Sequence, residues 1–180
     1  MIRALAAALA LCLAAPAGAQ VAEPDGYRME EYRAPVPDRL TGGTVLDVAA
    51  ARDLWARDAA AFVDVLPRTP RPRGLPEGTI WREPPHETIP GALWLPNTGY
   101  GAIAEATRAY LLDGLAEATD GDRGRPLVFF CRADCWMSWN AARRAIAEGY
   151  GDVRWMPEGV DGWAAAGYDL EVVEARPEAP

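Results

Sequence analysis

The chain of 180 residues carries a formal net charge of −8, from 26 acidic side chains against 18 basic ones, and it has one histidine. This balance argues against nucleic-acid binding, because proteins that bind nucleic acids present basic surfaces to the phosphates. Every basic side chain is an arginine, so chemistry that requires lysine, such as Schiff-base catalysis or a phosphate-loop lysine, is excluded.

The first 19 residues predict a secretory signal peptide. Arg3 supplies a positive start, residues 4–15 form an apolar run, and residues 17–19 (Ala-Gly-Ala) form a small-residue cleavage pattern before Gln20. This run is too short to span a bilayer and no later stretch is apolar enough, so we expect no membrane span. We therefore expect a periplasmic protein whose cysteines lie in an oxidising compartment.

The rest of the chain is interpreted as an N-terminal arm (20–43) on the surface, one domain (44–172) and a polar, frayed tail (173–180). Expected strands and helices alternate within the domain: strands at 44–48, 61–66, 93–96, 127–130 and 153–156, helices at 50–60, 103–118, 138–149 and 159–166. This alternation predicts a single α/β domain, with a parallel sheet and helices on both faces. Helical periodicity places Arg143 and Arg144 on an outward face.

A buried strand is interrupted by Asp64, for which two interpretations are open. Its carboxylate either accepts backbone N–H groups at the strand end or braces an active-site loop. Residues 67–90 then form a long Pro- and Gly-rich insert with four arginines, at 68, 71, 73 and 82. The insert is either a solvated loop or a lid whose arginines bind an anion. His86 lies within it and is expected to be structural or solvated.

The clearest chemical signal lies between residues 127 and 140. An apolar strand leads directly into Cys131, a short loop carries Cys135, and a helix follows. Backbone N–H groups of such a loop and the N-terminus of the helix favour a thiolate and lower the pKa of a cysteine placed there. Cys131 is therefore the candidate nucleophile. After the expected signal peptide the chain has two cysteines and one histidine, too few for a zinc site, and we expect neither a metal nor a cofactor.

Four motifs in this order resemble the rhodanese domain. They are residues 62–65 (Phe-Val-Asp-Val), 89–92 (Ile-Pro-Gly-Ala), the strand that ends at Cys131, and the closing stretch 150–168. Residues 131–142 are also similar to exported rhodanese-like proteins that are named for a CXXCW motif and associated with PQQ-dependent catabolism. Here three residues, not two, separate the cysteines.

The resemblance implies that Cys131 takes a sulfane sulfur from a donor such as thiosulfate. The persulfide would be held by N–H groups of the active-site loop, which comprises Arg132, Ala133, Asp134 and Trp136. The acidic Asp134 and the bulky Trp136 depart from the basic loops of catalytic rhodaneses, which argues against ordinary thiosulfate activity. Related phosphatases carry an arginine at the position of Met137, which argues against phosphatase chemistry.

Three roles for the cysteine pair remain open. In an enzyme that acts on a small sulfur or thiol substrate, Cys135 resolves a persulfide or mixed disulfide on Cys131. In a non-catalytic binding module, the loop, Trp136, Trp139 and the insert contact a periplasmic quinoprotein dehydrogenase or a cytochrome. In the third role the two cysteines form a purely structural disulfide, which would close only a small loop and stabilise little.

Overall fold

The computed structural model describes residues 21–177, so the expected signal peptide (1–19) lies outside the described residues. The elements are, in chain order, β1 (Thr44–Val45), α1 (Val48–Ala56), β2 (Ala61–Asp64), β3 (His86–Thr88), β4 (Leu93–Trp94), α2 (Glu105–Ala118), β5 (Leu127–Phe130), α3 (Trp136–Ala147), β6 (Val153–Trp155), α4 (Gly159–Ala165) and β7 (Glu171–Val173). Most strands of the expected sheet are shorter than the sequence indicated, and α3 begins two residues earlier.

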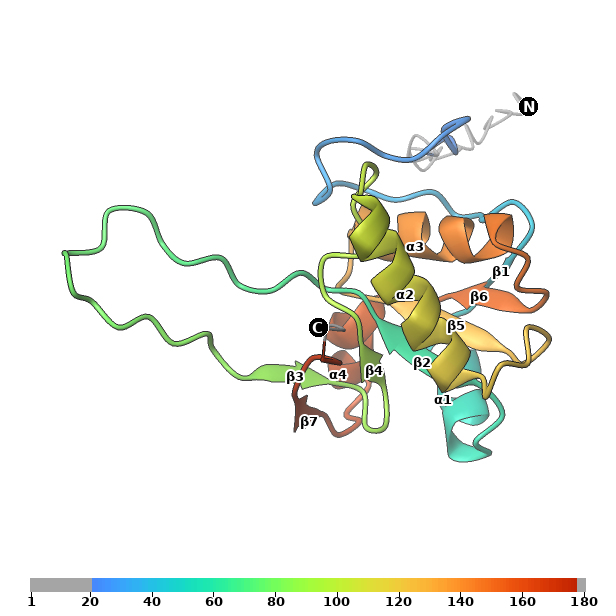
Figure 1. The fold of residues 1–180 in the computed structure, drawn as a ribbon. Helices are drawn as coiled ribbons and strands as arrows, with labels where there is room; N and C mark the ends of the chain where they lie inside the picture. The colour runs from blue at the N-terminus through green and yellow to red at the C-terminus, as the bar shows by residue number, and fades with distance from the viewer. Residues whose placement is uncertain (1–20, 178–180) are drawn as a thin grey trace, which may run out of the picture.

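Five of the strands form one parallel sheet in the order β1-β6-β5-β2-β4 (Figure 1). The predicted single α/β domain with a parallel sheet is therefore confirmed. The central strand β5 lies between β6 and β2, and all four of its residues are buried. Because the strands are parallel, the residues that follow β2, β4 and β5 meet at one edge of the sheet, where ligands of α/β proteins bind.

Alternating side chains of the sheet divide the core into two layers. Val63 and Phe129 point to the face that α2 and α3 cover, whereas Phe62 and Phe130 point to the face of α1 and α4. Successive side chains of a strand point to opposite faces, so strands covered on both faces must be apolar throughout. The helices on both faces of the sheet are visible in Figure 1.

A second, antiparallel pair of strands was not expected from the sequence. His86 pairs with Val173 and Thr88 with Glu171, which joins the end of the insert to the stretch after α4. The expectation of a frayed tail is wrong for the residues up to Arg176. The backbone N–H of Arg176 donates to the Trp94 carbonyl at 3.0 Å. Strands of three residues that lie so far apart in the chain leave no local signal, because their pairing depends on the fold that brings them together.

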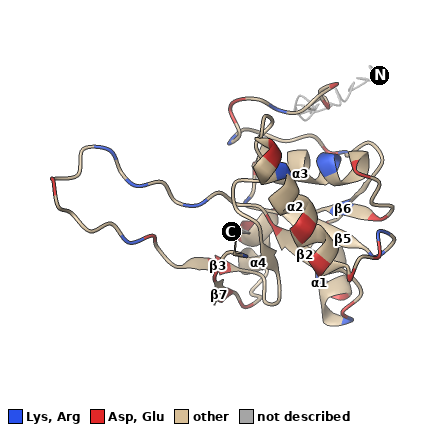
Figure 2. Cartoon of the chain, in the orientation of Figure 1, with Lys and Arg blue, Asp and Glu red and all other residues tan. Residues whose placement is uncertain are grey.

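Between β2 and β3 the insert leaves the domain as a long excursion, the green-coloured loop that projects from the body in Figure 1. Its arginines appear as blue segments along the excursion in Figure 2. Ile80 is 82% exposed there, which is unusual for a large apolar side chain. The insert is an extended, solvated segment whose base lies at the carboxyl edge of the sheet, and anion binding by its arginines stays a prediction.

Candidate active site

Cys131 and Cys135 flank the turn between the central strand and α3. Cys131 directly follows β5, and Cys135 is the residue that precedes the first turn of α3. Their Cα atoms are 6.4 Å apart and the two sulfurs form a disulfide, a separation within the usual range for bridged cysteines. The exposed fractions are 0% and 2%, so the bridge is enclosed by protein. Since α3 begins at Trp136, the positive end of its dipole adjoins Cys135.

The loop N–H groups do not form the free cradle that the resemblance implied. The Ala133 N–H donates to Asp161 Oδ2 at 3.0 Å, and the Trp136 N–H donates to the Tyr32 carbonyl at 2.9 Å. Asp134 adopts a left-handed backbone conformation, with φ of 52°. In the disulfide form, two of the N–H groups that were expected to hold the persulfide therefore already donate hydrogen bonds within the protein.

Arg132 and Asp161 meet at the outer side of the loop. The Arg132 Nε lies 3.3 Å from Asp161 Oδ1, and both side chains are exposed to solvent. One carboxylate thus faces a guanidinium and a loop N–H, the two kinds of donor that would bind an anionic sulfur compound. Asp161 lies in the closing stretch 150–168, which pointed to the fold only, so its place at the loop was not predicted.

Gly159 packs directly against the cysteine turn. A Cβ at this position would meet the Cys131 carbonyl oxygen and would lie 2.7 Å from Arg132 Cα, closer than Cβ atoms are found in proteins. The next residue, Val160, donates its N–H to the Cys131 carbonyl at 2.9 Å. The start of α4 therefore holds the first half of the loop in place by backbone contact.

Trp136 and Trp139 are buried, with exposed fractions of 2% and 0%. Their indole N–H groups donate to the carbonyls of Pro35 at 3.1 Å and Arg39 at 3.2 Å, both in the N-terminal arm. The binding-module alternative placed these two side chains against a partner protein, and this part of it is wrong, because the chain's own arm covers them.

The N-terminal arm is fixed across α3 by one buried amide. Asn140 accepts the Arg28 N–H at 2.9 Å and donates to the carbonyls of Arg28 at 2.9 Å and Gly99 at 3.0 Å. Further along the arm, Arg33 and Cys135 form an isolated antiparallel bridge. The arm therefore lies over the disulfide as well as over the helix, which the sequence analysis did not predict.

Arg144 is buried rather than outward-facing, with an exposed fraction of 4%. Its guanidinium donates to the carbonyls of Thr98, Tyr100 and Gly101 at 3.0 to 3.1 Å. Burial lowers the pKa of Arg144, because desolvation penalises its charged form. This arginine fixes the segment after β4 beside the cysteine loop.

Asp64 is fully buried and holds the base of the insert. Its Oδ1 accepts the Leu66 N–H at 2.8 Å, and its Oδ2 accepts the Thr88 hydroxyl at 2.7 Å and lies 2.8 Å from His86 Nε2. The His86 ring stacks on Trp94 with centroids 3.8 Å apart. This geometry matches the first interpretation of Asp64, a carboxylate satisfied at the end of a strand, and gives His86 a structural place.

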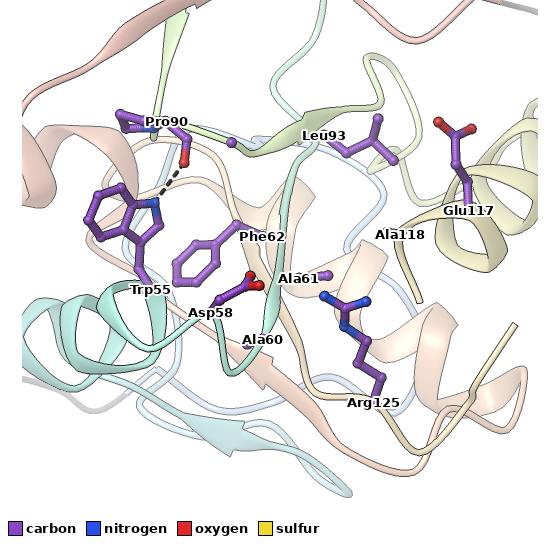
Figure 3. Close-up of a pocket in the computed structure, with 11 residues that line it drawn as sticks. Trp55, Asp58, Ala60, Ala61, Phe62, Pro90, Leu93, Glu117, Ala118 and Arg125 are labelled. Atoms are coloured by element: carbon purple, nitrogen blue, oxygen red, sulfur yellow. Dashed lines mark hydrogen bonds between the residues drawn. The ribbon is translucent and has the colours of Figure 1, made fainter. Parts of the chain in front are cut away.

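Two cavities lie at opposite ends of the sheet. An open cleft of about 600 Å³ is lined by Arg132 of the cysteine loop, by residues that follow β2 and β4, and by Arg33 of the arm. A pocket of about 450 Å³ is instead lined by Trp55, Phe62 and Arg125, among others (Figure 3). The second pocket lies at the amino end of β2 and β4, so it cannot serve chemistry at the cysteines.

Within the described residues, no group of three or more histidine, cysteine or carboxylate side chains is arranged to bind a metal ion. No helix of residues 21–177 has the length and apolar character needed to cross a membrane.

The fold and the cysteine turn together define an α/β domain that carries a cysteine pair at the carboxyl end of its central strand. The model of the rhodanese-like domain family matches residues 50–166, and the chain belongs to this family.

Several solved structures are similar to the chain. A thiosulfate sulfurtransferase from Pseudomonas aeruginosa is 19% identical with a TM-score of 0.50, and the match covers 76% of this chain and 21% of that one. An uncharacterized protein from Saccharomyces cerevisiae is 16% identical (TM-score 0.42, covering 69% and 92%). A 3-mercaptopyruvate sulfurtransferase from Leishmania major is 14% identical (TM-score 0.45, covering 81% and 40%). None of the curated proteins compared with the chain matches it.

Proposed function

We propose that this protein carries out sulfur transfer through a dithiol–disulfide couple formed by Cys131 and Cys135. The observation that carries the proposal is the bridge between the candidate nucleophile after β5 and a second cysteine at the start of α3. The bridge spans a sequence separation of only 4, so its contribution of about 2 kcal/mol is at the low end of the range typical of disulfides. A bridge at this place is better suited to chemistry than to stabilising the fold.

The proposed reaction begins with the reduced pair. The Cys131 thiolate attacks the sulfane sulfur of a donor such as thiosulfate, the donor's S–S bond breaks, and sulfite leaves with the electron pair. The Cys135 thiol then loses its proton and attacks the Cys131 sulfur, which forms the disulfide and expels the outer sulfur as hydrosulfide. The two cysteines are oxidised while the sulfane sulfur is reduced, and a thiol reductant restores the dithiol.

The surroundings of the loop favour a transient persulfide over a stored one. A long-lived persulfide anion needs N–H donors, yet Asp161 already accepts from Ala133 and approaches Arg132. Cys135 is close enough to form a bond with Cys131, so an intramolecular attack has a high effective concentration. Rapid release as hydrosulfide therefore fits this loop better than transfer to cyanide or another external acceptor.

We further propose that the protein acts in the periplasm, as an accessory to PQQ-dependent alcohol oxidation. The support is the signal-peptide pattern of residues 1–19 and the similarity of residues 131–142 to the exported CXXCW proteins. Periplasmic location would place the couple among oxidants and exported thiol reductants. Cell fractionation of a producing bacterium tests this location directly, with recovery in the cytoplasm as the contrary result.

The sulfur chemistry is tested by intact-mass measurement of reduced protein exposed to thiosulfate or polysulfide. In the Cys135→Ser variant we expect a stable gain of one sulfur on Cys131, because the resolving thiol is absent. In the wild type we expect loss of two hydrogens and release of hydrosulfide. The Cys131→Ser variant is the matched control and should gain no sulfur. If Cys135→Ser gains none with either donor, the proposed reaction is wrong.

A second candidate function is a binding module, which the projecting insert favours. Ile80 is 82% exposed and the insert carries several arginines, so the segment offers both apolar area and positive charge. The proposed partner is an acidic periplasmic quinoprotein dehydrogenase or cytochrome, recognisable by its absorption spectrum. Co-purification should persist in a Cys131→Ser/Cys135→Ser variant and be lost in Ile80→Asp. The opposite pattern would exclude the insert as the contact.

A further inference from the structure

The open cleft of about 600 Å³ beside the cysteine loop is built from segments that are far apart in the sequence. Arg68 lies just after β2, Asn97 and Tyr100 follow β4, Arg132 follows β5, and Arg33 comes from the N-terminal arm. The three strands are neighbours in the order β5-β2-β4. The cleft therefore occupies the carboxyl edge of a parallel sheet, where α/β proteins bind their ligands.

This arginine cleft concentrates basic side chains on a protein that is acidic as a whole. Its lining includes three arginines, Arg33, Arg68 and Arg132, and no carboxylate, although the chain has a net charge of −8. Arg132 directly follows Cys131 in the chain, and Arg33 forms an antiparallel bridge with Cys135, so the backbones of two of these arginines adjoin the two cysteines. The cleft is therefore suited to a ligand with more than one negative group.

Two of the three arginines are already in solvent-exposed ion pairs. Arg132 Nε lies 3.3 Å from Asp161 Oδ1, and these side chains are 53% and 38% exposed. Arg68 contacts Glu83 at 2.7 Å, a pair whose side chains are 45% and 28% exposed. Exposed pairs of this kind contribute little stability, so a ligand carboxylate can replace Glu83 at low cost. Among the described residues, the exposed Arg33 guanidinium has no hydrogen-bond or ion-pair partner.

The size and the remaining lining of the cleft indicate an organic ligand. Its volume falls within the range of about 300–1,000 Å³ that is typical of sites for small organic molecules, and a small inorganic anion such as thiosulfate would leave most of it empty. Leu66, Pro67 and Tyr100 supply apolar surface between the charged groups, and Asn97 and Thr69 supply polar atoms. This mixture matches a short peptide-like molecule with acidic ends.

We propose that the arginine cleft binds an organic thiol with two carboxylates, about the size of a tripeptide, and that this thiol is the reductant of the Cys131–Cys135 disulfide. The reaction rests on the proposed function, whereas the binding does not. The ligand thiolate attacks one sulfur of the bridge, a mixed disulfide forms, and the other cysteine leaves as a thiolate. A second ligand thiolate attacks the mixed disulfide, which releases the oxidised ligand and the second cysteine thiolate.

Binding is tested by titration calorimetry of the oxidised protein with S-methylglutathione, a tripeptide that has two carboxylates and no free thiol. We expect saturable binding that weakens about 5- to 20-fold in Arg33→Gln and in Arg68→Gln, because each loses a charge-assisted contact. Arg57→Gln removes the same charge from the end of α1, outside the cleft, and should bind like the wild type. Absence of binding, or equal affinity in all variants, would overturn the proposal.

Reduction of the bridge supplies a second, independent readout. The rate with glutathione is compared with the rate for the neutral thiol 2-mercaptoethanol, with the freed cysteines counted by alkylation and mass. Both reagents meet the same buried sulfurs, so the ratio of the rates isolates recognition by the cleft. Arg33→Gln should lower this ratio about 5- to 20-fold, and an unchanged ratio contradicts the proposal. In the calorimetry, thiosulfate that binds as tightly as the tripeptide also contradicts it.

The two proposals fail in different ways. If S-methylglutathione binds through Arg33 and Arg68 but Cys135→Ser never gains sulfur from a donor, the sulfur-transfer reaction is wrong and the cleft stands. If sulfur is gained but all variants bind the tripeptide equally or not at all, the reaction stands and the ligand of the cleft is wrong.

Discussion

Replacing Gly159 with alanine tests whether the start of α4 holds the cysteine loop in place. Gly159 has φ of +56°, and an alanine in this left-handed region costs about 1–2 kcal/mol. The added methyl group would also lie 2.7 Å from Arg132 Cα and close to the Cys131 carbonyl oxygen. Both neighbours are backbone atoms, so the loop must move, and overpacking of this kind costs about 1–3 kcal/mol.

The two contributions predict a loss of about 2–5 kcal/mol in the free energy of unfolding for Gly159→Ala. Gly167→Ala is the matched control, because Gly167 has φ of +81° but nothing lies within 4 Å of the position that its added methyl group would occupy. It should lose only the backbone contribution of about 1–2 kcal/mol. Urea unfolding of both oxidised variants measures the difference. Equal losses in the two variants would refute the role assigned to the contact with the loop.

Three other outcomes are expected. Reduction of the Cys131–Cys135 bridge should lower the unfolding free energy by about 2 kcal/mol, since it closes a very short loop; a loss above about 4 kcal/mol in urea unfolding would indicate a structural bridge. Asn140→Ala should cost about 1–3 kcal/mol by leaving partners unpaired and should speed alkylation of reduced Cys135, measured by mass, whereas an unchanged rate would show that the arm does not control access. Arg154 holds the pKa of the Asp152 carboxyl below its ordinary value of 3.8, so this pair stabilises the fold above that pH and the contribution is lost as the pH falls through the lowered pKa. The stability difference between wild type and Asp152→Asn should therefore shrink below pH 3.8 in acid unfolding curves, and a difference that grows there would contradict the assignment.

We expect the enclosed disulfide to become exposed through local release of the N-terminal arm. The backbone N–H and the indole N–H of Trp136 donate to carbonyls of the arm, and the Asn140 amide bonds both the N–H and the carbonyl of Arg28. These are a few hydrogen bonds in a segment without regular structure, and such segments open at lower free energy than a packed core. Local release of the arm would uncover Cys135 while the sheet stays folded.

Local patterns in the sequence were sufficient to predict the sheet and the position of the cysteine turn. Apolar runs of strand length and amphipathic helices in alternation predicted the parallel sheet, because this arrangement buries all of those faces at once. The position of Cys131 directly after the most apolar strand located the cysteine turn. Asp64 was also interpretable, since a buried carboxylate at a strand end must be satisfied by nearby donors.

The groups that surround the cysteines could not be predicted in this way, because they come from distant parts of the chain. Helical periodicity placed Arg144 outside, yet carbonyls of the segment after β4 accept its guanidinium and keep it buried. Asp161 takes a loop N–H from 28 positions away, and Arg33 reaches the cleft from the N-terminal arm. Such contacts depend on the path of the chain around the sheet. They contribute to stability only after distant segments have been brought together, so no local pattern in the sequence predicts them.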